Sequence, residues 1–161
     1  MAIEAPVSKY TKTNLKIYIA ACAAAAVIFA YDGYLSKYKW SGRYSFYKEH
    51  VLDNDGIPTS AMNFNRKSPP FFVAAAVFFG VYLFVVKNNK LIADENELVF
   101  SAKEKIPYDS IEAINKTYFD KKGFFVITYK NESGNQVDRK ITERKYDNLP
   151  AILDHLVKKI S

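Results

Sequence analysis

Asp32 is the residue of this sequence whose type and position most suggest a chemical role, because it is a charged residue at the end of an apolar run. The run extends from Ile17 to Tyr31, and it reaches Leu35 only if Asp32 and Gly33 are accepted within it. A carboxyl group inside a membrane span can relay protons or pair with a cationic side chain on another helix. At the end of a span it can instead reach the headgroup region, and the position of Asp32 favours this interpretation.

Aromatic and basic residues alternate in the first half of the segment that follows, which comprises residues 36–68. Tyr and Trp side chains settle at the depth of lipid headgroups, where neighbouring Lys and Arg side chains can bind phosphate. Arg66 and Lys67 precede Ser68-Pro69, where a serine cap and a proline are a good start for a helix whose dipole also favours an anion. Two interpretations are open: ordinary solvated residues of an interfacial belt, and a dedicated site for a lipid or a partner.

Residues for metal, cofactor or covalent chemistry are few and scattered. His50 and His155 have no partner at metal-ligand spacing, and the single cysteine, Cys22, cannot complete a zinc site within one chain. Asp53-Asn54-Asp55-Gly56 begins like a calcium loop but lacks a third oxygen ligand before its glycine and a later bidentate glutamate, so we interpret it as a turn. Nothing marks a phosphate-binding glycine loop or a catalytic triad. We therefore expect no enzyme activity, no cofactor and no metal site.

Two apolar runs define the elements that position these residues. Residues 69–86 carry no charge, and a helix of that length extends about 27 Å, enough to span a hydrocarbon core. Residues 17–35 form a poorer run, which loosely resembles a signal peptide around Ile19-Ala20-Ala21-Cys22. The apolar stretch before Cys22 is too short for a signal peptide, and apolar residues continue beyond it. We predict two transmembrane helices; the alternative is burial in a soluble core.

Small residues favour close helix packing in both predicted spans. Ala20 and Ala24 are four positions apart in the first span, as are Ala76 and Gly80 in the second. This spacing lets two membrane helices approach closely, so that van der Waals contact holds them together. The small-residue faces can therefore pack on each other within the hairpin or dock onto a foreign membrane subunit.

Residues 87–161 have the pattern of a small soluble domain. Short strand-forming runs alternate with turns, and Phe124–Lys130 is the most strand-like run of the chain. The last segment has apolar residues at helical spacing, namely Leu149, Ile152, Leu153, Leu156, Val157 and Ile160. We predict a β-meander closed by one amphipathic C-terminal helix. The polar tail at the other end, residues 1–16, is expected to be loosely ordered until Lys16.

Charge gives little further information about function or orientation. The formal net charge of +6 is spread along the chain, and no part is basic enough to indicate nucleic-acid binding on charge alone. The Lys and Arg residues near the ends of the two predicted spans divide almost equally between the two sides of the membrane. They are Lys9, Lys12, Lys16, Lys87 and Lys90 on one side, against Lys37, Lys39, Arg43, Lys48, Arg66 and Lys67 on the other. The excess of positive charge on cytoplasmic loops therefore does not decide the topology.

One segment of the C-terminal domain carries a family resemblance. It contains Leu98-Val99-Phe100-Ser101 and then Lys105-Ile106-Pro107-Tyr108-Asp109-Ser110-Ile111-Glu112-Ala113-Ile114. A strand ending in such an I-P-Y-x-x-I sequence, after two spans, resembles the pleckstrin-homology-like (PH-like) domains of small bacterial membrane proteins. The resemblance covers residues 88–161 and implies a strongly bent antiparallel sheet, or partial barrel, closed by the terminal helix. It also implies a cytoplasmic domain, and it brings no catalytic motif.

The predicted organisation is a membrane α-helical hairpin plus a small α+β domain. Its parts are a polar tail (1–16), a first transmembrane helix (17–35), an aromatic and basic connector (36–68), a second transmembrane helix (69–86) and a PH-like domain (87–161). We expect a two-pass protein of the inner membrane with both termini in the cytoplasm, the side that the resemblance implies for the domain.

The predicted function is that of a non-enzymatic accessory subunit. It would bind membrane lipids and a membrane-protein partner or a second copy of itself, and no nucleic acid. An anionic-lipid-responsive module is the first alternative, and a small oligomeric transporter or channel built around Asp32 is the second. The residues expected to bind a partner or a lipid headgroup are Ala20, Ala24, Trp40, Arg43, Tyr44, Arg66 and Lys67.

Overall fold

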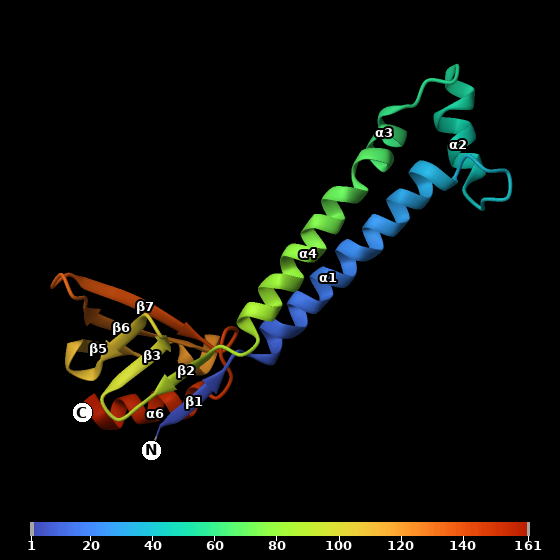
Figure 1. Ribbon diagram of the computed structural model, residues 1–161. Coiled ribbons are helices and arrows are strands. Elements are labelled where there is room, and N and C mark those ends of the chain that lie inside the picture. Colours follow the sequence, from blue (N-terminus) through green and yellow to red (C-terminus); the bar gives the residue numbers. More distant parts are fainter. Residues whose placement is uncertain (1, 161) are drawn as a thin grey trace. The chain divides into compact units, whose positions relative to one another are not determined.

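The chain divides into two compact units, which are described separately (Figure 1). The structure is a computed structural model that describes residues 2–160. One unit, Asn14–Leu83, contains most of the helical hairpin and its connector. The other joins the N-terminal segment, up to Thr13, to the chain from Phe84 onward. The first and last parts of the sequence therefore belong to the same unit.

The two long helices of the hairpin are long and apolar enough to cross a membrane. Helix α1 covers Lys9–Ala30 and continues into a π-helical turn, η1, at Tyr31–Leu35. Helix α4 covers Pro69–Val86, the limits of the uncharged run. Helix α1 begins before the predicted start of the first span because Ser8 caps it: the Ser8 Oγ accepts a hydrogen bond from the Thr11 amide over 3.1 Å. These helices indicate a membrane protein.

The predicted serine cap at the start of α4 is absent. The Ser68 hydroxyl is buried and, within residues 2–160, has no hydrogen-bond partner. The backbone carbonyl of Ser68 instead accepts from the amide of Phe71 over 3.0 Å. Pro69 still opens the helix, where its missing N–H costs nothing.

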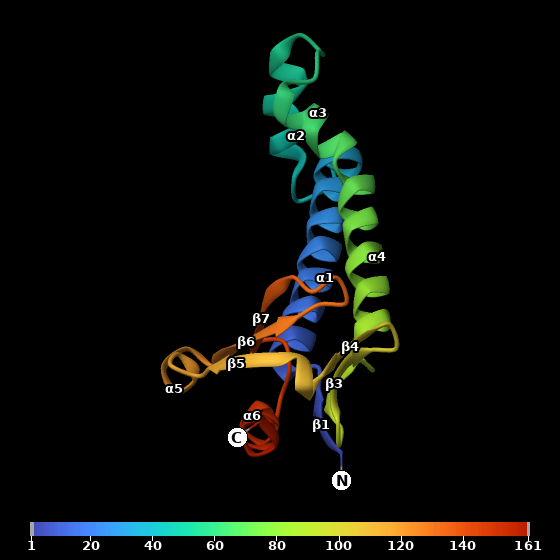
Figure 2. The same ribbon diagram turned by 90° about the vertical axis from the view of Figure 1, so that its left-hand side faces the viewer.

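Helices α1 and α4 pack side by side and antiparallel in both views (Figures 1 and 2). Ring contacts join Tyr18 to Phe79 at 5.4 Å and Phe29 to Phe72 at 5.3 Å. Several of the partly or fully covered side chains recur at alternating spacings of three and four: Ile19, Cys22, Ala26 and Phe29 on α1, and Phe72, Ala76, Phe79 and Leu83 on α4. Ala25 and Ala75, beside this row, are also partly covered. The alternating spacing is typical of helix pairs that pack as in a coiled coil. Ala20 and Ala24 lie outside this seam and are exposed, so α4 does not cover the small-residue face of α1.

The other unit contains two antiparallel sheets and a C-terminal helix, which confirms the predicted α+β class. The first sheet has the order β1 (Ile3–Pro6), β2 (Lys90–Ala93), β3 (Glu97–Ser101) and β4 (Glu104–Pro107). The second has the order β5 (Ile111–Asn115), β6 (Phe124–Lys130) and β7 (Gln136–Thr142). Short helices η3 (Tyr108–Ser110) and α5 (Phe119–Lys122) precede β5 and β6, and α6 covers Leu149–Ile160. Over the described residues the two sheets do not form a closed barrel.

The core of this unit lies between α6 and the two sheets. Helix α6, seen end-on in Figure 2, occupies the angle between them. Its buried face is the one that helical spacing predicts. Fully buried side chains from both sheets and from α6 meet there: Leu91, Leu98, Ile106, Phe125, Ile127, Ile141, Leu149, Ile152 and Leu156.

The N-terminal segment is not a loosely ordered tail, and this part of the prediction is wrong. Strand β1 pairs with β2 in antiparallel register, with Ala5 opposite Leu91. The side chain of Ala5 is fully buried. Ile3, Ala5 and Val7 alternate with polar residues, a strand pattern too short to be recognised from the sequence alone. Pro6 is tolerated because β1 lies at the sheet edge.

Burying a charge under β1 should destabilise the sheet unit. We expect Ala5→Asp to lower the free energy of unfolding by about 3 kcal/mol or more, because the carboxylate would be buried without a partner. Hydrogen exchange of the β2 amides in the full chain measures the effect. Glu4→Ala, on the exposed face of the same strand, is the matched control and should change exchange little. Equal protection in wild type and Ala5→Asp would contradict the assignment of β1 to the sheet.

Candidate interaction surface at the connector

The connector, residues 36–68, folds into a compact helical structure. It contains α2 (Tyr44–His50), a 3-10 turn η2 (Leu52–Asn54) and α3 (Ser60–Lys67). Thr59 caps α3 and also contacts the His50 Nδ1 through its hydroxyl at 3.0 Å. Val51 and Met62 are buried beneath these helices. A connector with its own buried side chains can hold surface residues in fixed positions.

The segment Asp53–Gly56 is a turn, as predicted. Asp55 has φ 54° and Gly56 has φ 78°, so both residues adopt left-handed backbone conformations. Glycine adopts this conformation without steric cost, and Asp tolerates it better than most residues. The turn reverses the chain between η2 and α3.

Asp32 forms an ion pair with Arg43, a contact that the sequence did not reveal. The Arg43 Nε and Nη2 atoms each donate to a different Asp32 carboxylate oxygen over 2.8 Å. The Asp32 side chain is 9 % exposed and that of Arg43 is 52 % exposed. Hydrogen bonding and charge attraction from Asp32 raise the pKa of Arg43 above its ordinary value. This two-pronged pair ties the end of the first apolar helix to the connector.

Gly33 allows η1 to lie directly against α3. A Cβ atom at Gly33 would lie 2.7 Å from the backbone oxygen of Asn65, closer than real side chains approach. Arg66 completes the contact, because its Nε donates to the Gly33 carbonyl over 3.1 Å. In return, the Tyr34 hydroxyl donates to the Arg66 carbonyl over 2.6 Å. These contacts form a clamp between η1, just before the connector, and α3, near the end of the connector.

Two of the three cations predicted to bind headgroups are already engaged in contacts within the protein. Arg43 binds Asp32, and Arg66 binds the backbone of Gly33. Lys67 is exposed and has no ion pair within the described part of the chain. The arrangement of these cations indicates a structural role for both arginines in holding the connector together.

Exposed aromatic rings form the most distinctive surface of the connector. Trp40 is 70 % exposed, and its ring stacks on Tyr38 with centroids 5.6 Å apart and planes 11° apart. The Nζ of Lys37 lies 5.1 Å from the centre of the Tyr38 ring. Tyr44, by contrast, is half-buried and lies beside Tyr47 with ring centroids 6.3 Å apart. We call the exposed pair Tyr38 and Trp40 the aromatic cap.

The sequence identified most of these residues but not their pairings. Trp40 is exposed as a binding residue should be, whereas Arg43 and Arg66 are engaged within the connector. The role of Gly33 was missed. Its only sequence signal was a glycine beside a charged residue at the end of an apolar run, a position where close backbone approach is one explanation.

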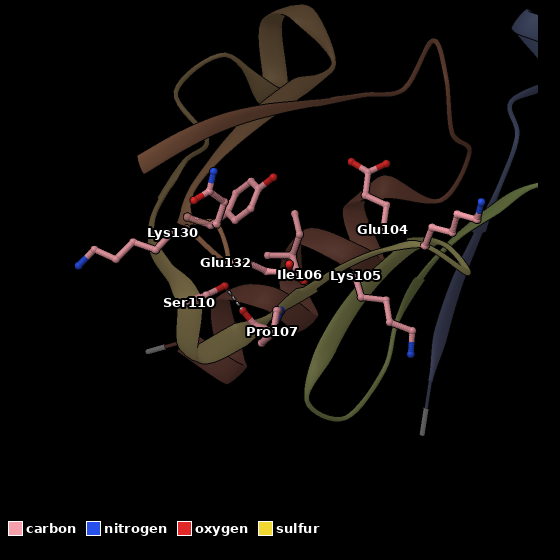
Figure 3. A pocket seen from close by; sticks show the side chains of 10 residues that line it. Glu104, Lys105, Ile106, Pro107, Ser110, Lys130 and Glu132 are labelled. Carbon is pink, nitrogen blue, oxygen red and sulfur yellow. Dashed lines mark hydrogen bonds between the residues drawn. The ribbon is translucent and has the colours of Figure 1, made fainter. Parts of the chain in front are cut away.

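A cavity beside β4 and the end of β6 has charges of both signs in its lining (Figure 3). Its volume is about 530 Å³. In Figure 3 the side chains of Lys105 and Lys130 extend away from its centre, and Ser110 donates to the Pro107 carbonyl. Three of the charged residues that line it are paired: Lys105 with Glu97, Lys130 with Glu112, and Glu104 with Arg139, over 2.7, 2.8 and 2.8 Å. Lys103 and Glu132 also line it and form no ion pair within the described residues.

Comparison of the chain with protein-family models, with curated proteins and with solved structures finds no match.

Asp32 is almost buried and Arg43 is half-exposed, so we expect the loss of Arg43 to destabilise the protein more than the loss of Asp32. Arg43→Ala leaves a buried carboxylate without a partner, which should cost about 3 kcal/mol. Asp32→Ala leaves a half-exposed guanidinium that water can solvate, and should cost about 1 kcal/mol. Thermal unfolding of the full chain in detergent, followed by Trp40 fluorescence, measures both. The double variant should resemble Asp32→Ala; equal losses in the two single variants would contradict this account.

The clamp between η1 and α3 predicts a clear difference between two glycines. Gly33→Ala would place a methyl group against the backbone of α3 and should force η1 and α3 apart. A Cβ at Gly42 meets no atom within 4 Å, so Gly42→Ala is a matched control. We expect hydrogen exchange in α3 to rise at least about tenfold in Gly33→Ala, the result of losing about 1.4 kcal/mol of local stability, and to stay unchanged in Gly42→Ala. Equal exchange in both variants would disprove the close contact.

Proposed function

We propose that this chain is a non-enzymatic, two-pass membrane protein that acts as an accessory subunit of a larger membrane complex. It anchors a PH-like domain at the cytoplasmic face of the inner membrane and docks through its connector. The observation that carries the proposal is the aromatic cap, an exposed Trp40–Tyr38 stack on a connector that is held by its own ion pair and clamp. Exposed aromatic residues on rigid supports are efficient binding anchors, because little side-chain freedom is lost on binding.

The outer surface of the hairpin supports the membrane location. Large apolar side chains on both helices face away from the seam and are exposed: Ile17, Val27, Ile28, Phe71, Val77, Phe78, Val81, Phe84 and Val85. An apolar surface of this extent is unusual on a protein in water, and a bilayer would cover it. The proposal therefore assigns these side chains to lipid.

The pairing of β1 with β2 supports the hairpin topology. Strand β1 precedes the first apolar helix and β2 follows the second, yet both belong to one sheet. Two crossings return a chain to the side from which it started. The proposal therefore places both sheets on one side of the membrane and the connector on the other. The resemblance to PH-like domains makes the sheet side cytoplasmic.

The exposed small-residue face of α1 supplies a second contact in the proposal. Ala20 and Ala24 lie outside the seam with α4. Small residues permit a neighbouring helix to approach closely within the membrane. A partner helix, from another membrane protein or a second copy of this chain, could pack there while the aromatic cap binds its extramembrane part.

The two alternative functions gain no support at the connector. A headgroup site made of Arg43, Arg66 and Lys67 would have to compete with the bonds that both arginines make. A proton relay at Asp32 would require that carboxylate to leave its ion pair with Arg43. We therefore favour partner binding over both alternatives.

Site-specific photocrosslinking in native membranes tests the proposal. A photoreactive amino acid replaces Trp40 or Ala20 in the full chain, and Ile57, exposed on the same connector, serves as the control position. We expect positions 40 and 20 to crosslink to the same membrane protein, or to a second copy of this chain, and position 57 to give no such product. Crosslinks to lipid alone at positions 40 and 20 would contradict the proposal.

Two further measurements accompany this experiment. Trp40→Ala should reduce recovery of the crosslinked partner at least about tenfold, as expected for an aromatic anchor, whereas Ile57→Ala should not. Carbonate washing should leave the chain in the membrane fraction. Release into the aqueous fraction would disprove the membrane anchor.

A further inference from the structure

A second cavity of the sheet unit is lined mainly by cations. It lies beside α5 and the paired ends of β6 and β7, and its volume is about 560 Å³. Its lining residues are Lys121, Lys122, Phe124, Lys140, Thr142 and Arg144, with no carboxylate among them. We call it the basic pocket. Four positive groups around one hollow produce a potential that attracts an anion.

The cations of the basic pocket form no ion pair with a neighbouring acid, although the carboxylate of Glu143 lies beside Gly123. In the described part of the chain none of the four forms an ion pair, whereas Glu104, Lys105 and Lys130 at the cavity of Figure 3 do. Aromatic rings hold two of them: the Lys140 Nζ lies 3.8 Å from the centre of the Phe124 ring, and the Lys122 Nζ lies 4.9 Å from that of Tyr118. Contact with a ring orients an ammonium group and leaves its charge in place.

The backbone gives the pocket a fixed shape and one further donor. Phe124 pairs with Thr142, and Val126 pairs with Lys140, in a regular antiparallel register. Lys140 and Thr142 are two residues apart in β7, so their side chains project from the same face. The Thr142 Oγ accepts from the amide of Arg144 over 3.3 Å, and its hydroxyl hydrogen stays available for an anion.

The rim of the pocket is bonded to the segment that leads into the first apolar helix. The Arg144 carbonyl accepts hydrogen bonds from the Ser8 hydroxyl and, over 2.6 Å, from the Thr11 hydroxyl. The Ser8 amide donates to the Lys145 carbonyl over 2.9 Å. Ile17, where the uncharged run begins, is six residues beyond Thr11 in the same helix, or about 9 Å along its axis. The chain therefore keeps the pocket close to any bilayer that α1 enters.

We propose that the basic pocket binds the phosphate group of an anionic membrane lipid in the leaflet where α1 enters the bilayer. The inference rests on the membrane anchoring proposed above but not on partner binding. Lysine and arginine side chains supply the charge, and the Thr142 hydroxyl and the N–H groups of Arg144 supply directional hydrogen bonds to phosphate oxygens. A lipid is the favoured source of phosphate because the tether holds the pocket near a surface where headgroups are concentrated.

Lysine acetylation of the full chain in nanodiscs tests the proposal. The protein is embedded in discs of phosphatidylcholine alone or of phosphatidylcholine with phosphatidylglycerol, and acetylation rates are read at each lysine by mass spectrometry. A bound phosphate covers the amines and stabilises their protonated, unreactive form. We expect Lys121, Lys122 and Lys140 to react at least about fivefold more slowly with the anionic lipid, while Lys103 and Lys158, which lie outside the pocket, change little.

Paired variants separate a specific site from general attraction to a charged surface. Lys121→Gln with Lys140→Gln should abolish the lipid-dependent protection of Lys122. Lys103→Gln with Lys158→Gln removes the same charge elsewhere and should preserve it. Equal slowing of all lysines, including Lys103 and Lys158 in the wild type, would overturn the proposal.

A parallel measurement with inorganic phosphate identifies the source of the anion. Inorganic phosphate at millimolar concentration, added to phosphatidylcholine discs, should not reproduce the protection; if it does, the pocket binds soluble phosphate and the lipid assignment is wrong. Failure of the anchor and failure of the pocket are also distinguishable. Without the anchor the chain would not enter the discs, whereas an embedded chain with unprotected pocket lysines would refute the pocket alone.

Discussion

The antiparallel pairing of β1 with β2 is the contact on which the rest of the structure depends. It joins the segment before the first apolar helix to the segment after the second. Both ends of the hairpin are thereby held at one sheet, and the Val7 amide reinforces the junction by donating to the Asn89 carbonyl over 3.1 Å. This long-range pairing makes the first and last parts of the chain members of one unit.

Charge is handled differently at the two candidate surfaces. In the connector, Asp32 and Arg43 pair, and Arg66 binds a backbone carbonyl, so these charges serve to hold the polypeptide together. This network leaves the exposed aromatic rings, together with Lys67, available for contacts. In the basic pocket, aromatic rings orient Lys122 and Lys140, and none of the four cations forms an ion pair within the described residues. Paired charges are typical of structural support, and clustered unpaired cations are typical of an anion site.

The proposed roles of the two surfaces are compatible, since they use separate residues. The aromatic cap belongs to the unit Asn14–Leu83, and the basic pocket belongs to the unit that contains both ends of the chain. In the proposed topology they lie on opposite sides of the bilayer. Binding of an anionic lipid would then hold the sheet unit at the membrane surface while the cap and the Ala20–Ala24 face engage a partner.

The sequence by itself determined the features that depend on local pattern. The uncharged run at Pro69–Val86 and the apolar face of Leu149–Ile160 are helices in the structure, because each pattern repeats over several turns. Only the tertiary structure decided that Asp32 meets Arg43, that Gly33 meets Asn65, that residues 3–6 form a strand, and that Lys121 and Lys140 share a pocket. These contacts join residues far apart in the chain or on different elements. Apart from the short alternation at residues 3–7, no periodicity encodes them, because they depend on how the elements fold together.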